Sequence, residues 1–301
     1  MRFTQFAIVL LLITTLVVLG CSSDDSLEIA EGGFLGGTQG IVADFEPFGV
    51  EEEGKLTIFN TEAFPIEVTV QNKGEYDTQA GDVVVSLLGP SPEEFSGIAS
   101  SSLPNAEILD PISELVPEGG EETITFASDA TYEGSVSGFV DRTWFGNIEY
   151  RYQTYTIVSE VCLKEDLSDS RICDVNGAKT FFVSGAPITV TKVEEDTAGK
   201  GIMAVKFTVS NVGGGDVTVP GQEFSATTDK LAFSLDDPEW ECKSAGKVNE
   251  ARLRDGKADI VCKLKEALAE NTLSTKQIEL TLDYIYRVLI QDTLRIKESA
   301  E

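Results

Sequence analysis

Hydrophobic and polar residues alternate with a period of two along much of this 301-residue chain. Ile66, Val68 and Val70 are separated by polar or charged residues, and the segment from Met203 to Val209 alternates in the same way. Such alternation is typical of antiparallel strands that bury one face. We therefore expect an all-β protein.

A short motif occurs twice and sets the expected domain organisation. Residues 68–74 read VTVQNKG, and residues 207–213 read FTVSNVG. Each copy predicts a strand that ends in an Asn-x-Gly turn, where we expect the glycine to supply a positive φ. A second correspondence aligns IEYRY at 148–152 with IELTL at 278–282. Because the two offsets are similar, the repeat predicts two tandem modules.

Turn residues separate further short segments with strand character. The Asp255-Gly256 pair predicts a two-residue hairpin turn, and the segment 264–270 is the one expected helix. Several short strands in modules of ~100 residues or more are typical of immunoglobulin-like β-sandwiches, so we predict two of these in tandem. The other expected strands are 83–88, 122–126, 230–234, 251–254 and 257–263.

The two Asn-x-Gly turns resemble those of CARDB-like sandwich modules, which occur in archaeal and bacterial cell-surface proteins. The segment GTQGI at 37–41 is similar to the opening of secreted two-module archaeal proteins of unassigned function. Leu282-Asp283-Tyr284 resembles the tyrosine corner of sandwich domains, with ordinary core packing as the favoured alternative. The resemblance implies a sandwich that displays or binds, with no catalytic residues.

The first twenty residues have the composition of an export signal. An apolar run from Phe6 to Leu19 follows Arg2 and is shorter than the ~20 residues of a membrane span. It ends in Val18-Leu19-Gly20-Cys21, which resembles a lipobox, so we predict a lipid on Cys21; an uncleaved N-terminal anchor is the alternative. The expected parts are a signal peptide at 1–20, a flexible tether at 21–37, and domains at 38–184 and 185–301.

The remaining four cysteines fall as one close pair in each half of the chain. An exported chain meets an oxidising compartment, where disulfides are the default. Of the three possible connectivities we choose Cys162–Cys173 and Cys242–Cys262, which gives each module one disulfide. A zinc site is a poor alternative, because the spacings do not fit and the chain has no histidine.

Acidic residues are concentrated in the first part of the chain. The formal net charge is −28, and residues 187–301 hold 15 basic and 20 acidic residues, so most of the excess precedes them. This charge argues against nucleic acid and anionic lipid surfaces as partners. We expect the acidic first module to face the partner, a divalent cation or a basic molecule, with solubility alone as the favoured alternative.

The residue inventory restricts the possible chemistry. Without histidine, Ser-His-Asp and Cys-His nucleophilic pairs and His-ligated zinc sites are excluded. No cofactor is expected, and calcium is the one metal that the sequence suggests. The segment from Asp174 to Gly177 resembles part of an EF-hand calcium loop but lacks the first aspartate and the closing glutamate of that pattern. A solvated acidic turn is therefore the favoured alternative. The candidate ligands are Asp166, Asp169, Asp174 and Asn176.

These features favour a non-catalytic lipoprotein on the outer face of the cell membrane. Its two sandwich modules would bind an envelope protein or polysaccharide. The alternative is a structural subunit of an envelope assembly, such as an S-layer or filament, that pairs through strand edges. A third hypothesis, a carboxylate-dependent hydrolase, would need a cleft with two facing acids.

Overall fold

The computed structural model describes residues 33–169, 171 and 173–299. These residues form an all-β fold that contains one short 3-10 turn, η1 (Pro92–Glu94). In this described part of the chain, no helix is long and apolar enough to cross a membrane. Cys21 and the expected signal peptide lie outside the described residues.

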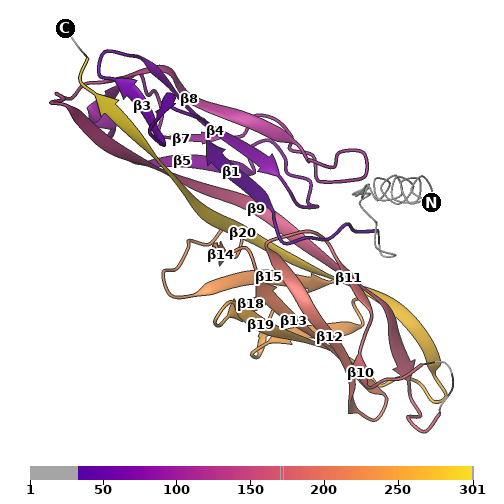
Figure 1. Ribbon diagram of the computed structural model, residues 1–301. Helices are drawn as coiled ribbons and strands as arrows, with labels where there is room; N and C mark the ends of the chain where they lie inside the picture. Colours follow the sequence, from indigo (N-terminus) through magenta and orange to yellow (C-terminus); the bar gives the residue numbers. More distant parts are fainter. Residues whose placement is uncertain (1–32, 170, 172, 300–301) are drawn as a thin grey trace, which may run out of the picture.

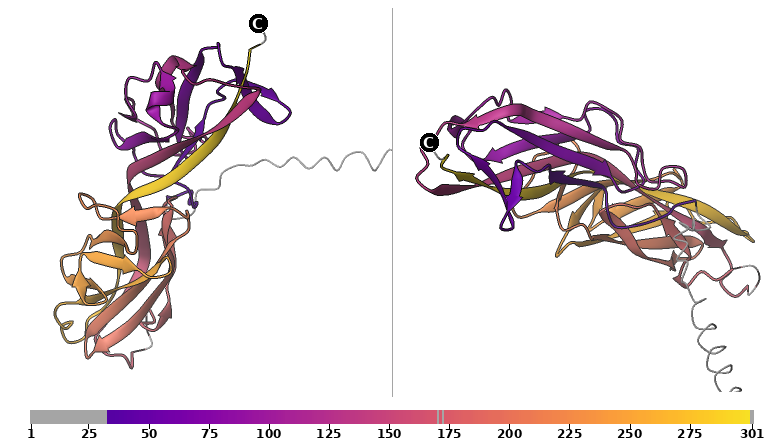
Figure 2. Two further views of the ribbon diagram at one scale, coloured as in Figure 1. Left: turned by 90° about the vertical axis from the view of Figure 1, so that its left-hand side faces the viewer. Right: turned by 45° about the horizontal axis from the view of Figure 1, so that its top comes forward.

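Two long strands run through the whole molecule. β9 (Phe139–Lys164) and β20 (Leu273–Lys297) are 26 and 25 residues long and pair antiparallel from end to end. At about 3.3 Å per residue, this ribbon is about 85 Å long. Two lobes lie end to end along it (Figure 1), and the elongated shape is also visible in the two turned views of Figure 2.

Three sheets make up the two lobes. The ribbon belongs to a ten-stranded sheet that extends through both lobes, and each lobe has a smaller sheet of its own. The first lobe's small sheet contains β1 (Ile41–Phe45), β4 (Phe64–Asn72), β8 (Glu121–Tyr132) and β6 (Phe95–Ser96). The second lobe's small sheet contains β10 (Gly177–Ala178), β12 (Ile188–Gly199), β13 (Ile202–Asn211), β19 (Lys257–Leu264), β16 (Trp240–Ser244) and β17 (Lys247–Val248).

The shared sheet gains short strands beside each lobe. In the first lobe these are β2 (Val50–Glu52), β3 (Lys55–Phe59), β5 (Val83–Gly89) and β7 (Ser102–Pro104). In the second lobe they are β11 (Phe181–Val183), β14 (Asp216–Thr218), β15 (Asp229–Leu235) and β18 (Glu250–Leu253). Each lobe is therefore a β-sandwich whose second layer is one half of the shared sheet.

Strand alternation builds the core of each sandwich. Along β4, every second residue from Phe64 to Val70 is buried, and β13 repeats this from Met203 to Val209. Burying one such side chain completely contributes about 1.5–3 kcal/mol. Large aromatic side chains fill the first lobe around Trp144, which contacts the rings of Phe48, Phe64 and Phe95.

Each half of the sequence supplies a strand segment to the other half's lobe. The end of β20 buries Leu294 and Ile296 in the first lobe and pairs in parallel with β3. The end of β9 buries Val158 and Val161 in the second lobe, where it pairs with β11. The boundary expected after residue 184 lies between β11 and β12, and the shared sheet crosses it.

Both disulfides, Cys162–Cys173 and Cys242–Cys262, are present and are compatible with an extracytoplasmic location. Each of the expected ranges, 38–184 and 185–301, contains one disulfide, but both disulfides lie in the same lobe, because β9 carries Cys162 past the junction between the lobes. There the Cys162 amide contacts Glu195 of β12, so both disulfides lie in the second lobe.

The helix expected at 264–270 is absent. Leu264 is the buried last residue of β19, and Lys265 continues the strand contacts by donating its backbone N–H to Glu239 O (2.9 Å). The following residues turn toward β20, and Leu268 N–H bonds Gly201 O (2.8 Å). A seven-residue segment gains too few helical hydrogen bonds to compete with these tertiary contacts.

The expected hairpin at 251–263 is half right. Asp255 and Gly256 both have a positive φ (51° and 72°), as a two-residue hairpin turn requires. However, β18 and β19 enter different sheets, and the isolated Arg254–Lys257 bridge at the turn is, among the described residues, the one β-bridge between their ends. The turn therefore forms a corner of the sandwich, because Ala251 and Ile260 are each needed in the core beneath a different sheet.

Candidate interaction site at the waist

Four tyrosines pack together where the two lobes meet, a region that we call the waist. Tyr152 lies opposite Tyr284, and Tyr150 lies opposite Tyr286, so all four project from the same face of the ribbon. Neighbouring ring centroids are 5.6–6.3 Å apart, and each side chain is at most 2% exposed. Aromatic pairs at this spacing add about 0.5–1.5 kcal/mol beyond their buried area. The waist is thus a packed core rather than a loose hinge.

Tyr152 holds the first Asn-x-Gly turn. Its hydroxyl donates to Asn72 Oδ1 (3.1 Å) and accepts the backbone N–H of Tyr76 (3.3 Å). Asn72 Nδ2 in turn donates to Tyr76 O (2.8 Å). The Tyr152 hydroxyl, the Asn72 side chain and the Tyr76 backbone therefore satisfy one another in a closed network.

Tyr286 repeats this network in the second lobe. Its hydroxyl donates to Asn211 Oδ1 (2.8 Å) and accepts the N–H of Gly215 (2.7 Å), and Asn211 Nδ2 donates to Gly215 O (2.7 Å). The structural repeat therefore matches Tyr152 with Tyr286. The alignment expected from 148–152 and 278–282 is wrong by four residues, because it followed the Ile-Glu pair instead of the hydrogen-bonding tyrosine.

The glycines of the two turns are needed for space. Gly74 and Gly213 do not have a positive φ, contrary to expectation. A Cβ on Gly74 would overlap the Tyr152 hydroxyl, and a Cβ on Gly213 would lie 2.6 Å from the Tyr286 hydroxyl. The Asn-x-Gly motif thus makes room for the tyrosine that caps it.

The other two tyrosines lie near the start of one strand of each small sheet, β1 in the first lobe and β12 in the second. The Tyr150 hydroxyl lies against Gly40, directly before β1, where a Cβ on that glycine would be 3.0 Å from it. Thr154 Oγ1 donates to Ile188 O (2.6 Å), at the start of β12, so it accepts the proton of Tyr284 (2.9 Å). Tyr284 is therefore a core residue whose hydroxyl is satisfied across the ribbon, in agreement with the core-packing alternative.

Burial keeps these hydroxyls protonated. Desolvation raises the pKa of Tyr150, Tyr152 and Tyr284 above the ordinary value, and it raises the pKa of Tyr286 to about 12. All four remain neutral hydrogen-bond donors at neutral pH.

Glu75 ties three chain segments together at the waist. Its carboxylate accepts the backbone N–H groups of Leu35 (2.7 Å), Gly36 (2.8 Å) and Gly185 (2.6 Å). The Glu75 N–H also donates to Gly185 O (2.9 Å). Hydrogen bonds to a carboxylate are stronger than neutral ones. This Glu75 clamp fixes the beginning of the described chain to the connection between β11 and β12.

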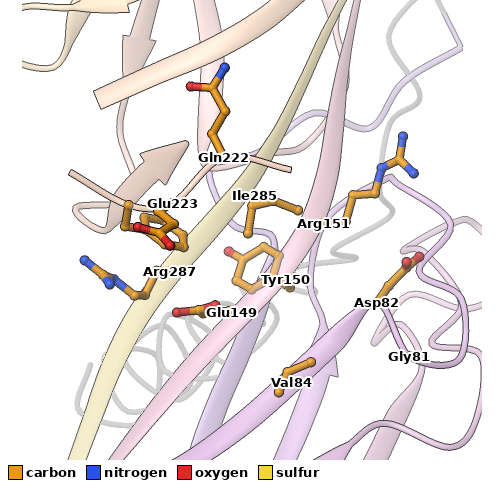
Figure 3. Close-up of a pocket in the computed structure, with 11 residues that line it drawn as sticks. Gly81, Asp82, Val84, Glu149, Tyr150, Arg151, Gln222, Glu223, Ile285 and Arg287 are labelled. Carbon is orange, nitrogen blue, oxygen red and sulfur yellow. The ribbon is translucent and has the colours of Figure 1, made fainter. Parts of the chain in front are cut away.

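A depression of about 620 Å³ lies on the ribbon face to which the residues that alternate with the four tyrosines point, and Tyr150 also lines it (Figure 3). Alternation along the ribbon turns Glu149, Arg151, Ile285 and Arg287 to this face. Both lobes contribute to its wall: Gly81, Asp82 and Val84 come from the first, and Gln222, Glu223 and Phe224 from the second.

Ion pairs hold the arginines of the depression. Arg287 donates to Asp216 (2.6 Å) and lies over the Phe224 ring, 4.2 Å from its centroid. Arg151 donates to Asp283 (3.3 Å). The depression thus presents fixed charges and hydrogen-bonding groups beside one aromatic ring. Such a surface can recognise a polar ligand.

Basic side chains at the end of β20 form ion pairs with acidic residues of the first lobe. Arg295 donates to both carboxylate oxygens of Asp141 (2.7 and 2.9 Å), and Lys297 pairs with Glu52. The net charge of this lobe is therefore less negative than the charge summed over residues 38–184 alone. That the lobe faces a cation or a basic partner stays a prediction.

The structure does not gather the candidate calcium ligands. Asp166 accepts hydrogen bonds from Ser168, and Asp169 accepts from Arg171, which lowers the pKa of Asp169 to about 2. Within the described residues, no group of three acidic or cysteine side chains is arranged to hold a metal ion. The Asp174 carbonyl accepts a hydrogen bond from Lys179, and Asn176 lies in the bend directly before β10.

Sequence reasoning missed the structural role of Glu75 and the Tyr152–Tyr286 match. A usable signal was present, because each Asn-x-Gly motif is followed by a tyrosine 75 to 80 positions later. Glu75 gave no signal, since its partners are backbone groups whose positions depend on the fold.

No protein-family model matches the chain, and no curated protein matches its sequence. Membership of the CARDB-like modules therefore stays a prediction that rests on the two Asn-x-Gly turns.

Proposed function

We propose that this protein is a non-catalytic lipoprotein on the outer face of the cell membrane, and that it binds an envelope partner at its waist. The observation that carries the proposal is the composite depression, whose wall comes from both lobes on one continuous sheet. A site built from strands is positioned more precisely than one on loops. Lipid attachment at Cys21 would hold this site at the cell surface.

The chemistry of the depression favours binding over catalysis. Its ionisable side chains are Asp82, Glu149, Arg151, Glu223 and Arg287, with Tyr150 beneath them. The two arginines are neutralised by carboxylates, and the chain contains no histidine for proton transfer. Fixed charges beside Phe224 suit the hydroxyl and charged groups of an envelope polysaccharide or the polar surface of an envelope protein.

The double variant Glu149→Gln/Glu223→Gln tests this site. We expect the intact chain to bind purified envelope polysaccharide or purified envelope proteins in biolayer interferometry, and the double variant to bind at least tenfold more weakly. The matched control is Glu114→Gln/Glu266→Gln, which changes two exposed glutamates outside the depression. Equal binding by all three chains, or binding by none, would refute the proposal.

A further inference from the structure

The described chain enters the fold at the waist, not at an end of the molecule. The Glu75 clamp holds Leu35 and Gly36 beside Gly185, and Gly40, directly before β1, then lies against the Tyr150 ring. The other terminus is different, because β20 ends at the tip of the first lobe (Figure 1).

The waist lies near the middle of the long axis. The two Asn–Tyr networks are related by an approximate two-fold rotation that passes through the Arg151–Ile285 pair. From Arg151, β9 continues for 12 residues toward Phe139 and for 13 toward Lys164. At about 3.3 Å per residue, each lobe extends about 40 Å from the waist.

The chain between the expected lipid and the fold is short by comparison. Twelve residue steps separate Cys21 from Gly33. Even fully extended, they span at most about 40 Å. A molecule standing on one lobe tip would therefore need this segment at full stretch along the whole lobe, and any shorter span tilts the long axis toward the bilayer.

We propose that the molecule is attached by its waist and lies along the membrane surface, with both lobe tips at similar heights above the lipid. This inference rests on lipid attachment at Cys21, which belongs to the proposed function. An end-tethered rod would lift one lobe away from the cell. Waist attachment instead keeps both lobes and the depression within about one lobe length of the bilayer.

Neutron reflectometry of the lipidated full chain on a phosphatidylcholine bilayer tests the orientation. At low coverage we expect a protein layer thinner than about 50 Å, because the long axis of about 85 Å lies in the plane. A layer of about 85 Å would overturn the inference. The Cys21→Ser chain separates the proposal of lipid attachment from the proposal of orientation. If neither chain forms a layer, or if both form it equally, lipid attachment at Cys21 is refuted, and the proposed orientation is refuted with it.

Fluorescence gives an independent measure of orientation. Dyes placed singly at Thr61, beside the end of β3, and at Lys200, beside the start of β13, mark the two lobe tips. Energy transfer to a headgroup dye should be similar from both positions. Strong transfer from one tip with none from the other would contradict waist attachment even if the layer is thin.

Discussion

The Tyr152 hydroxyl donates to Asn72 Oδ1, and Tyr286 and Asn211 form the same bond in the other lobe. These two pairs connect the shared ribbon to the two small sheets. The networks show that the internal repeat is structural, and they place its centre at the waist.

Removing one of these hydroxyls should destabilise the protein. In Tyr152→Phe and Tyr286→Phe, Asn Oδ1 and a backbone N–H lose a partner in a buried site, so we expect a loss of about 1–3 kcal/mol each. Urea unfolding measures the change. Tyr155→Phe is the control, because its hydroxyl bonds Gln153 at the surface of the ribbon. Equal effects at Tyr155 and Tyr152 would contradict the importance of the network.

Breaking the Glu75 clamp should release the beginning of the described chain. In Glu75→Gln, the neutral amide has one carbonyl oxygen to accept hydrogen bonds from the three N–H groups, and these bonds no longer involve a charged acceptor. The amide hydrogens of residues 33–40 should therefore exchange at least tenfold faster. The control is Glu118→Gln, which removes an exposed pair with Lys73. Unchanged exchange at 33–40 in Glu75→Gln would rule out the clamp.

Acid should loosen the end of β20. Hydrogen bonds from Arg295 and Lys55 lower the pKa of Asp141. Because this folded-state pKa lies below the unfolded value of about 3.9, the stabilisation is present above that pH and is lost as the pH falls through the folded pKa. Asp141→Asn should therefore reduce the loss of stability between pH 4 and 2.5, measured by urea unfolding. An identical pH dependence in both chains would contradict this assignment.

Reduction should affect the second lobe alone, since both disulfides lie there. Cys162→Ser/Cys173→Ser should cost about 2–4 kcal/mol and increase hydrogen exchange in β10–β12 and the end of β9. Protection of β4 and β8 should persist. Faster exchange spread equally over both lobes would show that the disulfide acts through global stability only.

Much of the strand pattern could be predicted from the sequence. The alternation of β4 and β13, the ends of β5 and β15, and the disulfide pairing all follow from local spacing. Each of these depends on residues close in sequence, where periodicity and loop closure carry the information.

The strand exchange between lobes could not be predicted in this way. A period of two specifies which face of a strand is buried but not its partner, so β9 and β20 could equally belong to two separate sandwiches. The lengths of β9 and β20 indicate that they extend beyond one sandwich, since strands in globular proteins usually have about 3–10 residues. The composite depression was hidden for the same reason, because its wall needs both lobes in place.

Separating the two halves of the chain tests the shared ribbon most directly. Residues 33–184 lack the β20 segment that buries Leu294 and Ile296, and residues 185–301 lack the β9 segment that buries Val158 and Val161. We expect neither fragment to unfold cooperatively alone, and the two together to form a stable 1:1 complex with one thermal transition. Two fragments that each fold alone, with cooperative transitions and no mutual affinity, would contradict the account.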